Sequence, residues 1–434
     1  MRYIPVTDKD REQMLKKCNA GSIEQLFTDI PDKVRLKEPL KLPKAKSEME
    51  LIKYMQSLSS MNSNTDDYAC FLGAGAYDHY IPSVISHLIS RQEFFTAYTP
   101  YQPEISQGTL TAIFEYQTMI CELTGMDVSN ASMYDGASAL AEACVIASSA
   151  SKKKQDILLV EDVHPQYSEV VETYLKFRGI NLKKVTVEQL YETDLSQTAG
   201  VCIQYPSFYG DIYDMEKIGE YVKNSGALFI VCANPMALAI LKSPSEFGAD
   251  FVVGEGQPLG IPLGYGGPYL GYFACTKEHM RKMPGRIVGK TVDVDGKTAY
   301  VLTLQAREQH IRREKATSNI CSNQALCALS ATIYLSVVGK EGFKQVARRC
   351  LDNAHYLYNG LLATNKFSKV SDMPFFHEFT VKPKEDISKL NDYLFENGYI
   401  GGLETEKGWL LAVTEKRTKE EMDDFIKKAG EFNG

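Results

Sequence analysis

Residues 249–271 read Ala249-Asp-Phe-Val-Val-Gly-Glu-Gly-Gln-Pro-Leu-Gly-Ile-Pro-Leu-Gly-Tyr-Gly-Gly-Pro-Tyr-Leu-Gly271. The first five residues are typical of a short buried strand. The rest is too rich in Gly and Pro to form a helix or a central strand, so it predicts a loop that bends sharply or approaches a neighbour closely. In α/β proteins such a loop is a common place for a ligand site, and a glycine-rich surface crossover is the alternative.

Around this stretch, short apolar runs alternate with helical patterns. Continuous apolar strands separated by helices are typical of a mostly parallel sheet that is covered on both faces. The sequence therefore predicts an α/β fold. The strands are expected at 157–160, 183–187, 200–204, 228–231, 251–253 and 272–276, and helices between them at 166–178 and 215–224.

Three parts are expected along the chain. Residues 1–64 form an N-terminal helical arm, because short helical patterns are broken by Pro31, Pro39 and Pro43. This arm wraps either a partner or the main domain. Residues 65–322 form the large α/β domain. Residues 323–434 form a long connecting helix and a small C-terminal α+β domain.

Composition excludes several classes of protein. The net charge of −7 does not fit a nucleic-acid footprint, and no apolar run is long enough to span a membrane. The ten Cys are scattered singly and the seven His show no metal-ligand spacing, so no metal site is expected. Because the first residues also lack the apolar region of a signal peptide, we expect a cytoplasmic protein.

Four motifs carry a resemblance to a known family. They are Gly75-Ala-Tyr-Asp-His-Tyr80, Tyr98-Thr-Pro-Tyr-Gln-Pro-Glu-Ile-Ser-Gln-Gly108, Leu123-Thr-Gly-Met-Asp127 and Arg307-Glu-Gln-His-Ile-Arg-Arg-Glu-Lys-Ala-Thr-Ser-Asn-Ile-Cys321. With the two-domain layout, they resemble the P-protein of the glycine cleavage system, a fold-type I pyridoxal-phosphate-dependent enzyme. The resemblance covers the whole chain. Its length and its Gly-Tyr-Gly-Gly-Pro-Tyr loop look like the α chain of the two-chain form.

The resemblance implies the following chemistry and partners. The complete enzyme decarboxylates glycine with pyridoxal phosphate and passes the aminomethyl group to the lipoyl arm of H-protein. The partner is a homologous β chain, in an α2β2 assembly, and T-protein and L-protein act in the same system. We expect the β chain to hold the cofactor, with none covalently bound to this chain.

Carried over residue by residue, the family's cofactor site becomes a vestigial cofactor pocket here. The phosphate turn matches residues 134–138, although helix capping alone would explain that pattern. Asn234 stands where an aspartate is expected, and a neutral amide stabilises a protonated ring nitrogen less well than a carboxylate does. Gln257 stands where the Schiff-base lysine is expected, and Lys242 and Lys277 lie elsewhere in the sequence. The pocket comprises Gly136, Ser138, His164, Asn234 and Gln257.

Since this chain lacks the lysine, no catalytic residue is expected within it alone, and it completes a site on the β chain. We call 98–107 and 307–313 the complementing segments. Their candidates are Tyr98, Tyr101, Gln102, Glu104, Ser106, Gln107, Arg307, His310, Arg312 and Arg313. Alternatively, the first segment forms part of the subunit interface, and the arginines of the second segment form salt bridges with Glu308 and Glu314.

Two other functions stay open at this stage. The chain could be a non-catalytic scaffold or regulator that only stabilises the β chain. It could also be a self-sufficient pyridoxal-phosphate enzyme that uses a displaced lysine. His79 could assist proton transfer near the site, or it could be a hydrogen-bonded structural histidine.

Overall fold

The computed structural model describes residues 5–151 and 154–434 of the chain. The chain folds into two compact units, one ending at Ser63 and the other spanning Asn64–Gly434. Among the described residues, all strands belong to the second unit.

The N-terminal unit has no buried core of its own. Its helices are α1 (Asp8–Lys17), a 3-10 turn (Ile23–Phe27) and α2 (Glu48–Ser59). Thr7 and Ser47 begin the two α-helices, since each hydroxyl accepts a hydrogen bond from the backbone N–H three residues later. No described residue of 5–63 is buried. Isolated helices this short are marginal in water, so their apolar side chains add little stability to this unit.

The second unit is built on a seven-stranded sheet of order β2-β8-β7-β6-β5-β3-β4. Its strands are β2 (Val128–Ser129), β3 (Asp156–Val160), β4 (Asn181–Val185), β5 (Thr198–Tyr205), β6 (Leu228–Ala233), β7 (Phe251–Glu255) and β8 (Gly271–Cys275). The strands from β7 to β4 are parallel, whereas β8 is antiparallel to both of its neighbours. The predicted α/β fold class with a mostly parallel sheet is confirmed.

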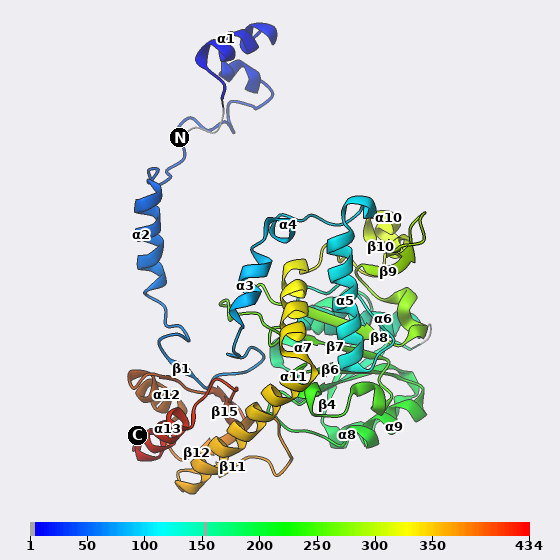
Figure 1. Cartoon of the computed structure of the whole chain (residues 1–434), viewed down its shortest axis with the longest axis vertical. Coiled ribbons are helices and arrows are strands. Elements are labelled where there is room, and N and C mark those ends of the chain that lie inside the picture. Colours follow the sequence, from blue (N-terminus) through cyan, green and yellow to red (C-terminus); the bar gives the residue numbers. More distant parts are fainter. Residues whose placement is uncertain (1–4, 152–153) are drawn as a thin grey trace. The chain divides into compact units, whose positions relative to one another are not determined.

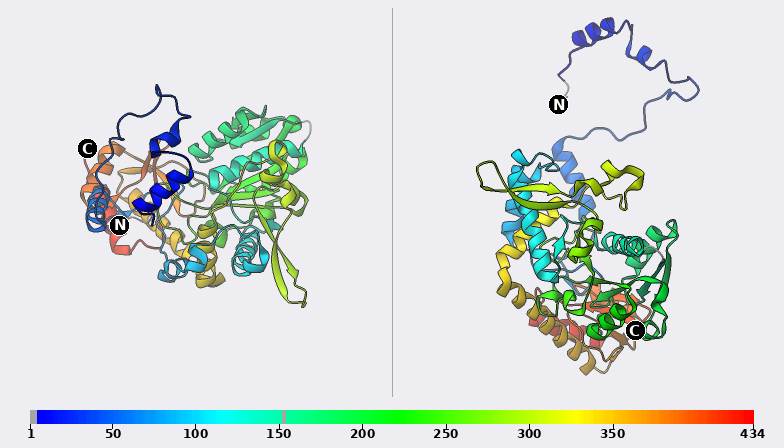
Figure 2. Two further views of the ribbon diagram at one scale, coloured as in Figure 1. Left: turned by 90° about the horizontal axis from the view of Figure 1, so that it is seen from above. Right: turned by 90° about the vertical axis from the view of Figure 1, so that its right-hand side faces the viewer.

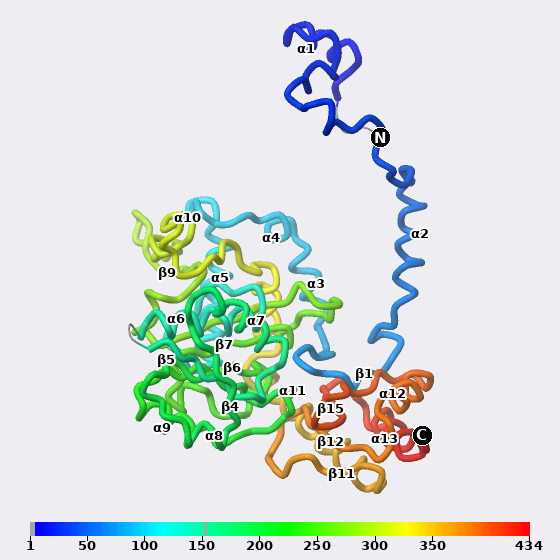
Figure 3. The backbone as a smooth tube through the Cα atoms, turned by 180° about the vertical axis from the view of Figure 1, so that it is seen from behind, coloured from blue at the N-terminus to red at the C-terminus, as the bar shows by residue number. Residues whose placement is uncertain are grey.

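Side chains of each strand alternate between two hydrophobic layers. In β3, Ile157 and Leu159 pack on one face, and Leu158 and Val160 pack on the other. Figure 3 shows α6 (Gly136–Ala150) and α7 (Pro165–Lys176) over the first face. Figure 1 shows α5 (Gln107–Thr124) and α11 (Ala325–Ala363) side by side over the second, which α9 (Met215–Ser225) also covers. Burial on both faces explains why the strands are continuously apolar.

The connecting helix α11 is two helical segments joined at one residue. Gly339 has φ 60° and ψ 177°, which is not helical. The predicted helix 323–338 therefore corresponds to the first segment. Few residues other than glycine adopt this conformation, so the residue type fixes the position of the kink.

The C-terminal sheet is antiparallel, with the order β11-β12-β15-β14. Its elements are β11 (Phe367–Lys369), β12 (Glu378–Pro383), β14 (Leu403–Thr405), β15 (Gly408–Ala412), α12 (Ile387–Glu396) and α13 (Lys419–Glu431). Its core also takes in Phe71, whose ring lies 4.1 Å from that of Phe425. Phe71 follows β1 (Ala69–Cys70), which pairs in parallel with β13 (Tyr399–Ile400).

Some elements had not been expected. The region after Lys282 forms a hairpin of β9 (Ile287–Val292) and β10 (Thr298–Thr303), which projects from the body in Figure 2. Only its base is buried, against α5, so its sequence lacks the apolar alternation of a covered strand. The remaining short helices are α3 (Ser83–Ile89), α4 (Gln92–Phe95), α8 (Val187–Glu192) and α10 (Gln309–Arg312).

Candidate functional site

Two residues of the predicted cofactor pocket, His164 and Asn234, line a cavity where several parallel strands end. His164 follows β3, Gln204 is the last but one residue of β5, Asn234 follows β6 and Glu255 ends β7. All four line one cavity. In open α/β sheets, ligands bind at these carboxyl ends of the strands. The topology therefore brings together residues that the sequence separates by almost one hundred positions.

His164 is fixed by hydrogen bonds on both ring nitrogens. Its Nδ1 accepts from the N–H of Gln166 at 3.2 Å, and its Nε2 lies 2.9 Å from the carbonyl oxygen of Ala74. Because Nδ1 accepts, Nε2 carries the proton and the ring is neutral. Burial lowers the pKa of His164, which also favours this state.

The predicted phosphate turn is the start of α6. Asp135 is the N-cap, and its carboxylate accepts from the N–H of Ser138 at 2.7 Å. The Ser138 hydroxyl bonds back to the Asp135 carbonyl oxygen at 3.1 Å. The N–H of Gly136 instead points at Glu255, whose Oε2 accepts it at 3.0 Å.

Glu255 was not among the predicted site residues, yet it is central to the pocket. Its Oε1 accepts from the N–H groups of Leu270 at 2.9 Å and Gln257 at 3.1 Å. Burial raises the pKa of Glu255 to about 7, although these backbone hydrogen bonds favour the charged form. The chain thus places its own carboxyl group against the first N–H of α6, at the predicted phosphate turn.

Gln257 is fully engaged by backbone groups. Its amide nitrogen donates to the carbonyl oxygens of Tyr77 at 2.9 Å and Ile261 at 2.8 Å, and its Oε1 accepts from the N–H of Tyr77 at 2.9 Å. The side chain is almost completely buried. It holds the glycine-rich loop against the Gly75–Tyr77 segment and has no chemistry available for a ligand.

The side chain of Asn234 also forms a hydrogen bond with the backbone. Its Oδ1 accepts from the N–H of Met236 at 2.9 Å, and its own N–H donates to the Tyr205 carbonyl oxygen at 2.9 Å. This pattern is an Asx turn directly after β6.

The residues present do not fit pyridoxal phosphate. The cavity is only about 30 Å³, which admits one or two water molecules, whereas small-molecule sites usually measure about 300 Å³ or more. No lysine among the described residues lines the cavity, and Lys242 is instead exposed and paired with Glu216. A phosphate would also meet the carboxyl group of Glu255.

The two complementing segments meet in the structure. Arg286, from the loop before β9, donates to the Tyr101 hydroxyl at 3.2 Å and lies over its ring. Its Nε is 3.9 Å from the carboxylate of Glu308, which is also 3.6 Å from His310. The rings of Tyr101 and His310 stand edge to face, with centroids 6.3 Å apart. The sequence did not single out Arg286, because it lies outside the motifs that carry the family resemblance.

The other residues of the first segment differ in their surroundings. Tyr98 is 85% exposed and borders a largely apolar hollow of about 250 Å³ beside the start of α11. Gln107 is structural, since its amide bridges the Pro103 carbonyl and the backbone of Tyr300 in β10. Gln102 and Glu104 are exposed, and Ser106 precedes α5 without a side-chain capping bond.

The arginines of the second segment are not equivalent. Arg307 is committed to the backbone, because its guanidinium donates to the carbonyl oxygens of Met283 and Gly285. Burial lowers the pKa of Arg307. Arg312 and Arg313 are exposed, and Arg312 borders a hollow of about 250 Å³ that Arg281 and Lys282 also line.

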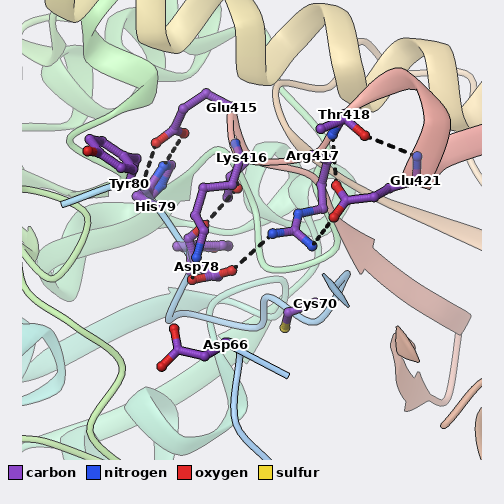
Figure 4. A network of polar contacts seen from close by, with 12 residues as sticks. Asp66, Cys70, Asp78, His79, Tyr80, Glu415, Lys416, Arg417, Thr418 and Glu421 are labelled. Carbon is purple, nitrogen blue, oxygen red and sulfur yellow. Dashed lines mark hydrogen bonds and ion pairs between the residues drawn. The ribbon is translucent and has the colours of Figure 1, made fainter. Parts of the chain in front are cut away.

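His79 belongs to a separate polar network at the C-terminal sheet, shown in Figure 4. Its Nδ1 lies 2.7 Å from Oε2 of Glu415, and the same oxygen accepts from the Cys350 thiol at 3.2 Å. The other oxygen of Glu415, Oε1, accepts from the Tyr80 N–H at 2.7 Å. Burial alone would raise the pKa of Glu415, but the hydrogen bonds led by His79 lower it to about 2. Donor atoms of His79, Cys350 and Glu415 lie within 4.8 Å of one another, a cluster that sequence spacing did not reveal. Since they are already bonded to one another, the arrangement favours the structural role of His79.

Comparison with known proteins defines the family. A family model described as glycine cleavage system P-protein matches residues 1–429. The chain belongs to the glycine cleavage system P-protein family. The resemblance inferred from the motifs is therefore confirmed.

Relatives of this P-protein chain match it over almost its full length. A probable glycine dehydrogenase (decarboxylating) subunit 1 of Desulforamulus reducens is 53% identical, covering 99% of each chain. A crystal structure of glycine decarboxylase (P-protein) of the glycine cleavage system, in inhibitor-bound form, is 39% identical, covers 99% of this chain and 100% of that one, and has a TM-score of 0.92. The prediction that the chain is a subunit of a glycine-decarboxylating enzyme is confirmed at the level of the family.

A more distant structure shares only the fold with this P-protein chain. A glutamate decarboxylase of Lactobacillus brevis is 13% identical, covers 92% of this chain and 95% of that one, and has a TM-score of 0.68.

Glycine decarboxylases of the family depend on pyridoxal phosphate. Among the described residues, no helix is long and apolar enough to cross a membrane.

Proposed function

We propose that this chain is the α subunit of a two-chain glycine decarboxylase and completes an active site held by a homologous β chain. The complex decarboxylates glycine and transfers the aminomethyl group to the lipoyl arm of H-protein. Pyridoxal phosphate, bound by the β chain, supplies the electron sink for the carbanion that decarboxylation leaves. This chain forms no covalent bond to it.

One observation carries the proposal. Gln257, at the position of the Schiff-base lysine, is buried with both ends of its amide bonded to backbone. An amide cannot act as the nucleophile that imine formation requires. Catalysis in a family that depends on the cofactor must therefore draw on another chain.

The contribution of this chain comes from the complementing segments. Tyr98 is largely exposed beside an apolar hollow, where a β chain could cover it. Arg286 holds Tyr101 by a hydrogen bond and by its position over the ring, which fixes that aromatic side chain at the protein surface. In the complex these side chains orient the substrate and exclude water, while Gln107 and Arg307 hold the segments in place.

The assembly follows from the same reasoning. Relatives are named subunit 1, which implies a second subunit. We propose an α2β2 tetramer in the cytoplasm, with lipoylated H-protein as acceptor and with T-protein and L-protein acting on the product and the carrier. The N-terminal unit, which has no buried residue among 5–63, supplies surface for contact within this assembly.

An absorbance titration with pyridoxal phosphate, followed by borohydride reduction, tests the proposal. The isolated chain should gain no reducible adduct, and a mixture with the β chain should gain both the adduct and glycine-dependent release of carbon dioxide. A reducible adduct on the isolated chain would favour a self-sufficient enzyme that uses another lysine.

Tyr98→Ala separates catalytic complementation from a scaffold role. Since Tyr98 is 85% exposed, the variant should fold and assemble normally, and the carbon dioxide release of the mixture should fall about tenfold or more. Phe177→Ala is the matched control, because Phe177 is 86% exposed at the end of α7. Loss of assembly without loss of turnover per complex would support the scaffold alternative.

A further inference from the structure

The start of α6 forms a small cup in which the backbone converges on one carboxyl group. The N–H groups of Gly136, Gln257 and Leu270 point at the two oxygens of Glu255, at 3.0, 3.1 and 2.9 Å. Glu255 is only 8% exposed. Gly136 is the first residue of the 15-residue helix α6, whereas Gln257 and Leu270 belong to the glycine-rich loop. Three N–H donors that converge in this way are an arrangement suited to an anion.

The backbone of this cup is tightly packed on glycine. A Cβ at Gly136 would lie 2.9 Å from the N atom of Glu255, and one at Gly254 would lie 2.3 Å from the Ala233 carbonyl oxygen. Only glycine allows such approaches of backbone to backbone. The backbone of the cup is thus closely packed, although this chain has Gln257 where the Schiff-base lysine is expected.

Tyr167 fills the space next to the cup. Its ring stacks on that of His164, with centroids 4.7 Å apart and planes at 16°. Its hydroxyl would be 2.7 Å from a Cβ on Gly136, so the side chain reaches from the histidine to the start of α6. It therefore covers the face of the histidine on which another planar ring would otherwise stack.

We propose that Glu255 is a built-in substitute for the phosphate group, and that removing its side chain opens a latent phosphate-binding cup at the start of α6. The carboxyl group satisfies the same N–H donors that a phosphate would use, and its volume and charge exclude an external anion. Tyr167 fills the stacking face of His164 in the same way. The inference concerns this chain alone and does not depend on the β chain.

Thermal unfolding of the full chain with inorganic phosphate tests the inference. Glu255→Ala should gain a saturable rise in midpoint temperature, about 2 °C at a phosphate concentration ten times the dissociation constant. Chloride at equal ionic strength provides the reference, and mildly alkaline pH keeps phosphate doubly charged. The wild-type chain should respond to phosphate no more than to chloride.

Two variants serve as controls. Glu255→Gln keeps the volume of the side chain without its charge, so the cup stays filled and no phosphate response is expected. Asp214→Ala removes a carboxylate from the exposed N-cap of α9, where the side chain accepts from the Lys217 N–H at 3.1 Å. It should show no saturable response either, because that helix start has no enclosing cup.

The phosphate responses of the variants and the wild-type chain either support the inference or overturn it. If Glu255→Ala folds poorly, phosphate should restore its folded fraction, as judged by circular dichroism. Equal responses of Glu255→Ala and the wild-type chain, or no restoration of a poorly folded variant, would overturn the inference. An equal response of Glu255→Gln would show that loss of charge, rather than an opened cup, is responsible.

Discussion

At the scale of single residues, the buried carboxyl group of Glu255 links the pocket to the stability of the fold. Burial raises its pKa from an ordinary 4.5 to about 7. The folded state therefore holds this proton more tightly than the unfolded state. The associated stability is fully present below pH 4.5 and is lost as the pH rises through about 7, by about 3 kcal/mol in total.

Glu255→Gln should reduce this loss. Between acidic and neutral pH, the free energy of unfolding of the variant should fall less steeply than that of the wild-type chain. Some slope should remain, because burial also raises the pKa of Glu378 to about 7. Urea unfolding at a series of pH values measures the difference. Identical slopes for the two proteins would contradict the proposed titration of Glu255.

Also at the residue scale, Gln257→Lys should not create a cofactor site. The new amine would face the carbonyl oxygens of Tyr77 and Ile261, while Glu255 and Tyr167 still fill the pocket. The loss of the amide hydrogen bonds should destabilise the fold by about 1–3 kcal/mol. Mass spectrometry after borohydride reduction should find no phosphopyridoxyl group on Lys at position 257. Detection of such a group would show that the missing lysine is the only feature that prevents this chain from binding the cofactor covalently.

At the scale of elements, the kink of α11 tests how the two segments of the connecting helix are joined. Gly339 has φ 60° and ψ 177°, and nothing lies within 4 Å of an added Cβ. Gly339→Ala should therefore act through backbone strain alone and cost about 1–3 kcal/mol. Gly342→Ala is the control in the same helix. Its Cβ would make an ordinary 3.5 Å contact with Val338, so a gain of about 0.5–1 kcal/mol is expected.

Chemical denaturation of both glycine variants measures the contrast. If both changed stability in the same direction, the junction would not require the conformation of Gly339.

At the scale of the whole molecule, the N-terminal unit has exposed apolar side chains, and none of its described residues, 5–63, is buried. Its basic residues, including those of 33–46, offer many sites for trypsin. In the isolated chain these sites should be cut before those of the second unit, since exposed and poorly packed segments open most easily. Addition of the β chain should protect them. Gel electrophoresis measures the rate of cleavage. An unchanged rate in the mixture would argue against a contact between the arm and the partner.

The sequence by itself determined the main strands and helices, because apolar runs and caps such as Thr7 act over a few residues. Specific motifs determined the family, and Gln257 predicted the missing nucleophile. Only the tertiary structure showed that Glu255 caps α6 from a position 119 residues away, and that Arg286 joins Tyr101 to Glu308. The reason is physical. Local patterns record which face of an element is buried, whereas the filling of a pocket depends on which strand ends the sheet topology brings together.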